Sequence, residues 1–222
     1  MNKLRVSRGV STIEFALSTL VLVPLVLGTG ALGINMIHTL GTIQLARDAG
    51  HMYCRGVDFS QQGNKDLLAK LGSSLGLSST PGEGQAVVIL SALTYVDNNA
   101  CVLVGAVDIN NNPTSACTNL NKWVFTQRLV IGNNNLRASN YGTPTGVTLD
   151  AYGKIKIDEY VKKSGAVATF SNANGINPYR VVDNQASGLP SGQRLYLAEA
   201  GGLGFAMKPF VSASPTYAFA FF

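Results

Sequence analysis

The 222-residue sequence predicts an α+β protein in which one long N-terminal helix precedes a mixed globular domain with an antiparallel sheet. Three observations predict this class. An uncharged apolar run occupies residues 15–37, and a helical pattern continues from it to about residue 55. Strand-like segments bounded by Asn and Gly follow. The length allows one membrane anchor and one globular domain of ordinary size.

The apolar run is long enough to cross a membrane. Phe15–Ile37 contains 23 residues without a formal charge, which as a helix measure about 35 Å against a hydrocarbon core of about 30 Å. Pro24 and three glycines within the run predict a kink or a locally melted turn. Lys3, Arg5 and Arg8 precede the run and predict that the domain after it lies outside the cytoplasm.

The first helix is expected to extend well beyond the membrane, from about residue 10 to 55, with Gly56 as its C-cap. One face carries apolar or small residues at spacings of three and four: Ile34, Ile37, Gly41, Leu45, Ala49 and Met52. A second helix is expected from Asn64 as N-cap to Gly72 as stop. These boundaries divide the chain into 10–56, the helix, and 57–222, the globular domain.

Two segments rich in β-branched and aromatic residues predict strands, Gln85–Val96 and Lys122–Ile131. Cys101–Val107 is expected to form a shorter strand between them, followed by a turn at Asp108–Pro113. Lys154–Lys163 is expected to pass from a strand into a helical turn.

Two strands are expected near the C-terminus. Arg194–Ala200 is one. In the tail, Tyr217, Phe219 and Phe221 alternate with alanine, which predicts a terminal strand whose aromatic side chains face the core.

Charge argues against nucleic-acid binding. The formal net charge is +5, but without residues 1–9 the chain has 14 basic and 12 acidic residues. No Lys/Arg cluster interleaved with aromatic residues is present among these.

The chain has three cysteines. In an oxidising compartment Cys101 and Cys117 are the natural pair and are expected to join two neighbouring strands, which leaves Cys54 unpaired. The alternative is that all three cysteines are buried thiols.

No motif in the sequence has both the residues and the surroundings that a catalytic, cofactor-binding or metal-binding site of its kind needs. Gly28–Gly33 matches a dinucleotide-binding pattern but lies within the apolar run, where small residues serve helix packing. Asp108-x-Asn110-x-Asn112 begins like a calcium loop but lacks the glycine and glutamate that such a loop needs. His38 and His51 lie on the first helix, so neither is expected to complete a Ser/His/Asp arrangement in the globular domain. The sequence therefore predicts no enzyme activity, no cofactor and no metal site.

A motif at the start of the apolar run carries the functional signal. A basic leader ends at Gly9, and Val10-Ser11-Thr12-Ile13-Glu14-Phe15 places a carboxylate five positions after the glycine. An acidic residue within a membrane helix costs roughly 2.5–3.5 kcal/mol on insertion scales, so a function that needs it is expected.

These residues resemble a type IV prepilin signal. The nearer similarity is to the TadE-like minor pilins (pseudopilins) of the tight-adherence (Tad) pilus, through Ile13–Leu17, Pro24 and Gln44–Gly50. Leu197–Ala200 and Tyr217–Phe221 are similar to closing elements of that family. The similarity covers residues 8–55 well, the last 30 residues loosely and the middle hardly at all.

The resemblance implies a type IV pilin-like fold and a structural role in a pilus. Residues 1–9 would be a leader cleaved between Gly9 and Val10 by a prepilin peptidase, and Glu14 and Phe15 would serve assembly with other pilin subunits. The protein would reside in the bacterial inner membrane with its domain in the periplasm and then join the pilus. No nucleic-acid partner or small-molecule substrate is implied.

An ordinary signal peptide is the alternative. Phe15–Leu27 would be its apolar region and Thr29–Ala31 its cleavage site, which would release a secreted adhesin or binding module beginning at Leu32. Glu14 and the apolar stripe that continues to Met52 argue against it. A third class, a membrane-anchored periplasmic hydrolase, has no candidate catalytic residues in the sequence.

Overall fold

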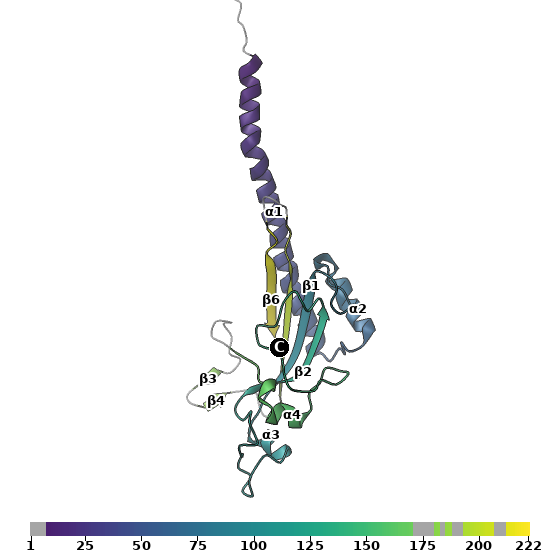
Figure 1. Ribbon diagram of the computed structural model, residues 1–222, viewed down its shortest axis with the longest axis vertical. Helices are drawn as coiled ribbons and strands as arrows, with labels where there is room; N and C mark the ends of the chain where they lie inside the picture. Colours follow the sequence, from purple (N-terminus) through teal and green to yellow (C-terminus); the bar gives the residue numbers. More distant parts are fainter. Residues whose placement is uncertain (1–7, 171–179, 183–184, 188–192, 207–211) are drawn as a thin grey trace, which may run out of the picture.

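A computed structural model describes residues 8–170, 180–182, 185–187, 193–206 and 212–222. One long helix, α1 (Arg8–Cys54), lies along the globular domain with its C-terminal half and projects beyond it with its N-terminal half (Figure 1). The remaining described chain forms short helices and an antiparallel sheet. The predicted α+β class is confirmed.

Helix α1 has nearly the predicted bounds. It contains 47 residues and stays helical through Pro24, so the expected melted turn does not form, and Figure 1 shows only a gentle change of direction. A proline within a helix removes one backbone hydrogen bond, and the turns on either side hold the rest. Gly56 follows the helix with φ of 87°, as expected of a glycine C-cap.

The main sheet has four antiparallel strands in the order β2-β1-β5-β6. Their bounds are Ala86–Tyr95 for β1, Trp123–Gly132 for β2, Arg194–Leu203 for β5 and Pro215–Phe221 for β6. All four strands were predicted from the sequence. A separate hairpin pairs β3 (Arg180–Val182) with β4 (Gln185–Ser187).

The predicted strand at Cys101–Val107 is wrong. Helix α3 (Asn98–Leu103) occupies this place, because the side chain of Asp97 accepts a hydrogen bond of 2.9 Å from the backbone N–H of Ala100 and caps a helical turn. The turn at Asp108 forms as expected, with its carboxylate accepting from two backbone N–H groups.

Helix α2 (Gln62–Leu71) begins before the predicted N-cap, Asn64, whose side chain instead donates to the carbonyl of Asp58. Gly72 is its C-cap, as predicted. A short 3-10 helix, Ser73–Leu75, follows.

The segment Lys154–Lys163 passes from extended chain into a helix, as expected: isolated bridges form at Lys154 and Ile155, and helix α4 (Ile157–Lys162) follows. Asp158 and Glu159 therefore lie on a helix, and each pairs with a lysine four residues later. A second 3-10 helix, Ser164–Ala166, follows α4.

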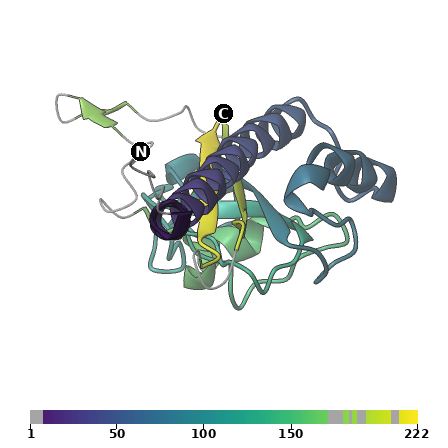
Figure 2. The ribbon, with the colours of Figure 1, turned by 90° about the horizontal axis from the view of Figure 1, so that it is seen from above.

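Helix α1 covers one face of the sheet, over β5 and β6 (Figure 2). Small side chains on these strands allow the close approach: Ala198, Ala200 and Ala218 are buried against Leu45, Ala46 and Ala49 of the helix. Leu90 and other apolar residues of β1 complete this core. The predicted apolar face of α1 is partly wrong, because Ile37 is 68% exposed and the docked stripe runs instead through His38 and Thr42.

The opposite face of the sheet is covered by the irregular chain after β2. Tyr141, which is fully buried, packs there against Phe219 and Phe221 of β6 at ring-centroid distances of 5.7 and 5.3 Å. The tail is thus an ordered strand, as predicted. Its aromatic side chains lie on the face away from α1 and remain half-buried.

Candidate functional site

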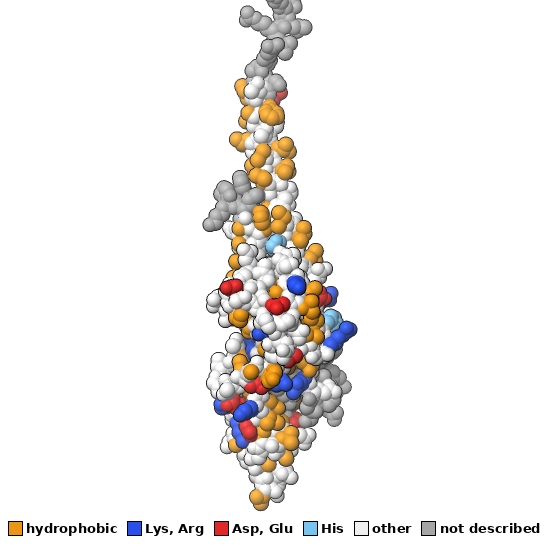
Figure 3. Space-filling model, turned by 90° about the vertical axis from the view of Figure 1, so that its right-hand side faces the viewer, with side chains coloured by type: hydrophobic (Ala, Val, Ile, Leu, Met, Phe, Trp, Pro, Cys, Tyr) orange, Lys and Arg blue, Asp and Glu red, His pale blue; other side chains and the backbone are white. Residues whose placement is uncertain are grey.

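The N-terminal half of α1 is an apolar surface without a partner in the described chain. Fifteen large apolar side chains between Ile13 and Ile43 are exposed, among them Phe15 at 72% and Leu20 at 73%. Figure 3 shows that charged side chains gather on the globular domain, whereas apolar side chains dominate the projecting helix. α1 is the one helix among the described residues that is long and apolar enough to cross a membrane.

Two threonine hydroxyls on this half of the helix are satisfied within the helix itself. The hydroxyl of Thr19 donates to the carbonyl of Phe15 at 2.8 Å, and that of Thr29 donates to the carbonyl of Leu25 at 3.0 Å. Such bonds remove the need for water around a threonine. The surface is therefore suited to an apolar environment.

Glu14 is the one formally charged side chain between Thr12 and Ala46, and it is exposed. Gly9 and Val10 lie in the first turn of α1. Phe15 follows Glu14 and is exposed as well. The structure thus places all four sequence-predicted residues within two turns at the free end of the helix.

The other half of α1 is fixed to the β5–β6 hairpin by polar contacts. The side chain of Asn35 exchanges two hydrogen bonds with the backbone of Phe205, and the hydroxyls of Thr42 and Thr216 lie 2.9 Å apart. Tyr53, one end of the docked stripe, donates to Gln127 of β2. These contacts hold the C-terminal half of α1 against the sheet.

A buried ion pair lies on the opposite face of the sheet. Arg128 of β2 and Glu199 of β5 are 6% and 1% exposed, and their charged atoms are 3.9 Å apart. Glu199 also accepts hydrogen bonds from Ser139, the backbone N–H of Asn140, and Tyr217. Arg128 donates to Ser91 and to the carbonyl of Gly142. The network joins all four strands of the main sheet to the covering loop.

This environment perturbs its titratable neighbours. Burial, and then the negative charge of Glu199, raise the pKa of the Tyr217 hydroxyl well above its usual range. The same two causes raise the pKa of Tyr141 to about 12. Burial lowers the pKa of Arg128, and Glu199 opposes this.

The sequence patterns predict no role for Arg128 or Glu199. The available signal was a charged residue in the interior of each of two largely apolar strands. A charge at such a position is expected to be paired when the strand is central in a sheet. The strand order, which sets β1 alone between β2 and β5, was not deducible from the local patterns.

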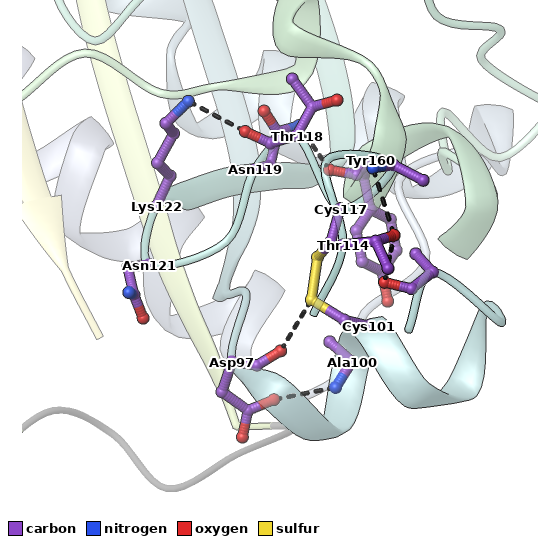
Figure 4. The surroundings of a disulfide bond; sticks show 12 residues. Asp97, Ala100, Cys101, Thr114, Cys117, Thr118, Asn119, Asn121, Lys122 and Tyr160 are labelled. Atoms are coloured by element: carbon purple, nitrogen blue, oxygen red, sulfur yellow. Dashed lines mark hydrogen bonds between the residues drawn. A yellow bond between two sulfur atoms is a disulfide. The ribbon is translucent and has the colours of Figure 1, made fainter. Parts of the chain in front are cut away.

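The predicted disulfide joins Cys101 and Cys117, with Cα atoms 5.7 Å apart. It does not link two strands, because Cys101 lies on α3 and Cys117 in the loop that returns to β2 (Figure 4). The side chain of Asn119, nearby and fully buried, donates to the carbonyls of Tyr160 and Lys163. Together the bridge and Asn119 stabilise the end of the domain farthest from the free half of α1. Cys54 is a free thiol.

The structure defines a class of protein, namely an α+β domain carrying a long apolar helix that is suited to anchoring in a membrane. No protein-family model, curated protein or solved structure matches the chain. In the part of the chain that the structure describes, no group of three or more His, Cys, Asp or Glu side chains is placed to hold a metal ion.

Proposed function

We propose that the chain is a structural minor pilin, or pseudopilin, of a Tad-type pilus, which assembles into or primes the pilus after cleavage at Gly9 and contributes to adherence. The observation that carries the proposal is the division of α1. One half is docked on the sheet, and the other projects with its apolar side chains exposed.

This apolar surface needs a partner. Burying a large apolar side chain is worth about 1.5–3 kcal/mol, so the exposed surface of α1 strongly favours lipid or other apolar helices over water. A membrane anchor alone requires a span of about 20 residues. The continuation of the same helix into the domain supports a second use, in which helices of neighbouring subunits pack side by side and carry their domains outward.

Glu14 supports the same proposal. Cleavage after Gly9 creates a positive amine on Val10, one helical turn before the carboxylate of Glu14. Two opposite charges in an apolar zone bear a smaller desolvation cost when they are paired, most readily between neighbouring subunits. The carboxylate then specifies how one helix is placed against the next.

Substitution of Glu14 tests the proposal. Glu14→Val keeps the helix apolar and removes the charge, and Glu83→Val removes an exposed acid from a loop of the domain as a matched control. We expect the Glu14 variant to be inserted and cleaved but to be poorly incorporated into the pilus, with loss of pilus-dependent adherence. Normal incorporation and adherence of the Glu14 variant would contradict the proposal.

A second candidate, a secreted adhesin or binding module, is favoured by the position of the docked contacts. The hydrogen bonds of α1 with the β5–β6 hairpin begin at Asn35. A chain beginning at Leu32 would therefore keep these hydrogen bonds, although it would lose the buried Ala31. The N-terminal residue of the mature protein distinguishes the two candidates.

A further inference from the structure

A cavity of about 470 Å³ opens on the face of the sheet that α1 does not cover. Ile89, Val130 and Leu149 supply apolar lining, and Arg128, Arg137 and Thr143 supply polar groups. Sites for small molecules usually have volumes of about 300–1,000 Å³, a mostly apolar lining and a few polar groups that orient the ligand. The cavity meets each of these requirements.

Arg137 is held in place before any ligand binds. Its stem crosses β5 at Gly201, where a Cβ atom would lie 3.1 Å from the Cδ atom of the arginine. Its guanidinium carbon lies 3.9 Å from the centroid of the Tyr217 ring, and Nη2 donates to the side chain of Asn140 at 3.0 Å. Two contacts thus hold the guanidinium and a third holds the stem, which lowers the entropy cost of binding a ligand to this side chain.

The positive charge of Arg137 is not matched by a carboxylate. Among the described residues, ion pairs are formed by Arg128, Lys162 and Lys163 but not by Arg137. Glu199, the buried acid of this face, is already paired with Arg128 and accepts three further hydrogen bonds. Among the described residues, the buried Nε atom of Arg137 has no hydrogen-bond partner. The described part of the site therefore has an excess positive charge.

We infer that this cavity binds a carboxylate carried on an apolar body about the size of an amino acid, with Arg137 as the residue that receives the carboxylate. The planar guanidinium matches the two oxygens of a carboxylate. The apolar lining suits an aliphatic or aromatic body rather than a free inorganic anion. A small free acid and the C-terminal residue of a peptide share this chemistry. The inference does not depend on the proposed role in a pilus.

Calorimetric titration of the full chain in detergent micelles tests the inference. N-acetyl-L-leucine is the carboxylate probe, N-acetyl-L-leucinamide is its uncharged match, and inorganic phosphate is the anion without an apolar body. We expect binding of the acid and little binding of the other two. A tripeptide ending in leucine, as the free acid and as the amide, distinguishes the two sources: tighter binding of the tripeptide acid than of N-acetyl-L-leucine indicates a peptide C-terminus, and weaker binding indicates a small free acid.

Two variants examine the site itself. Arg137→Gln removes the charge while keeping a polar side chain over Gly201, and Arg55→Gln, at an exposed position after α1, is its matched control. We expect Arg137→Gln to weaken binding of N-acetyl-L-leucine by about tenfold or more, as for a lost charge-assisted pair, and Arg55→Gln to leave it unchanged. Ala138 lines the cavity and is exposed, so Ala138→Trp keeps Arg137 and adds bulk within the cavity; it should block binding even if Arg137→Gln proves unstable. Failure of the acid to bind, equal binding of the acid and its amide, or unaltered binding in Ala138→Trp would overturn the inference.

Discussion

Replacing either of two tyrosines with phenylalanine should change stability in opposite directions. In both cases the ring stays and one hydroxyl is lost. The hydroxyl of Tyr217 donates to Glu199 at 2.7 Å. The hydroxyl of Tyr141 is buried and has no partner in the described part of the chain.

The magnitudes follow from these surroundings. A hydrogen bond to a charged group contributes about 1.5–3 kcal/mol, so Tyr217→Phe should lower the free energy of unfolding by about 2 kcal/mol. A buried polar group without a partner costs about 1–3 kcal/mol, so Tyr141→Phe should raise the free energy of unfolding by about 1 kcal/mol. The two variants should differ by about 3 kcal/mol, a large part of the stability of an ordinary domain.

Urea unfolding of the full chain in micelles at neutral pH, followed by circular dichroism, measures both variants against the native sequence. A lower midpoint for Tyr217→Phe and a higher one for Tyr141→Phe are expected. If both midpoints shifted in the same direction, or did not differ, this prediction would be refuted. The hydroxyl of Tyr217 could then not be the one that is hydrogen-bonded while that of Tyr141 lacks a partner.

Three further predictions concern other parts of the domain. Replacing Cys101 and Cys117 together with alanine should lower the free energy of unfolding by about 3 kcal/mol, because the bridge closes a short loop, and Cys54→Ala should have little effect in the same urea titration. Gly50→Ala should destabilise the protein by about 1–3 kcal/mol, because a Cβ at this position would overlap the ring of Phe222. Gly63→Ala is the control, since a Cβ there would lie in open space on α2. Equal urea midpoints for the two variants would contradict this packing. The free energy of unfolding should fall as pH rises from about 10 through about 12. Tyr141 keeps its proton in the folded state until about pH 12 but loses it near pH 10 when unfolded. Tyr141→Phe should therefore reduce the dependence of the free energy of unfolding on pH in this range.

Local patterns predicted most of the elements. The length of α1, the four strands of the sheet and the pairing of Cys101 with Cys117 follow from apolar periodicity, β-branched composition and cysteine spacing. The strand expected at Cys101–Val107 failed because one side-chain cap at Asp97 outweighed β propensity. Propensity is a weak guide in a segment of six or seven residues.

The buried features of the site depend on tertiary structure. Which face of α1 meets the sheet is decided by the alanines of β5 and β6, so Ile37 remains exposed although it fits the apolar stripe. The ion pair of Arg128 and Glu199 brings together residues 71 positions apart, across the intervening strand β1. Neither could be deduced without the strand order. By contrast, the residues expected to serve processing and assembly lie close together because they are close in the sequence.

The N-terminal residue of the mature protein tests the central proposal most directly. Intact-mass measurement and N-terminal sequencing of the protein isolated from its native membrane should find Val10 at the start, which places Glu14 at the fifth position of the mature chain. A mature protein beginning at Leu32 would contradict the proposal and favour a secreted module. Retention of Met1 would also contradict it and would leave an unprocessed anchor.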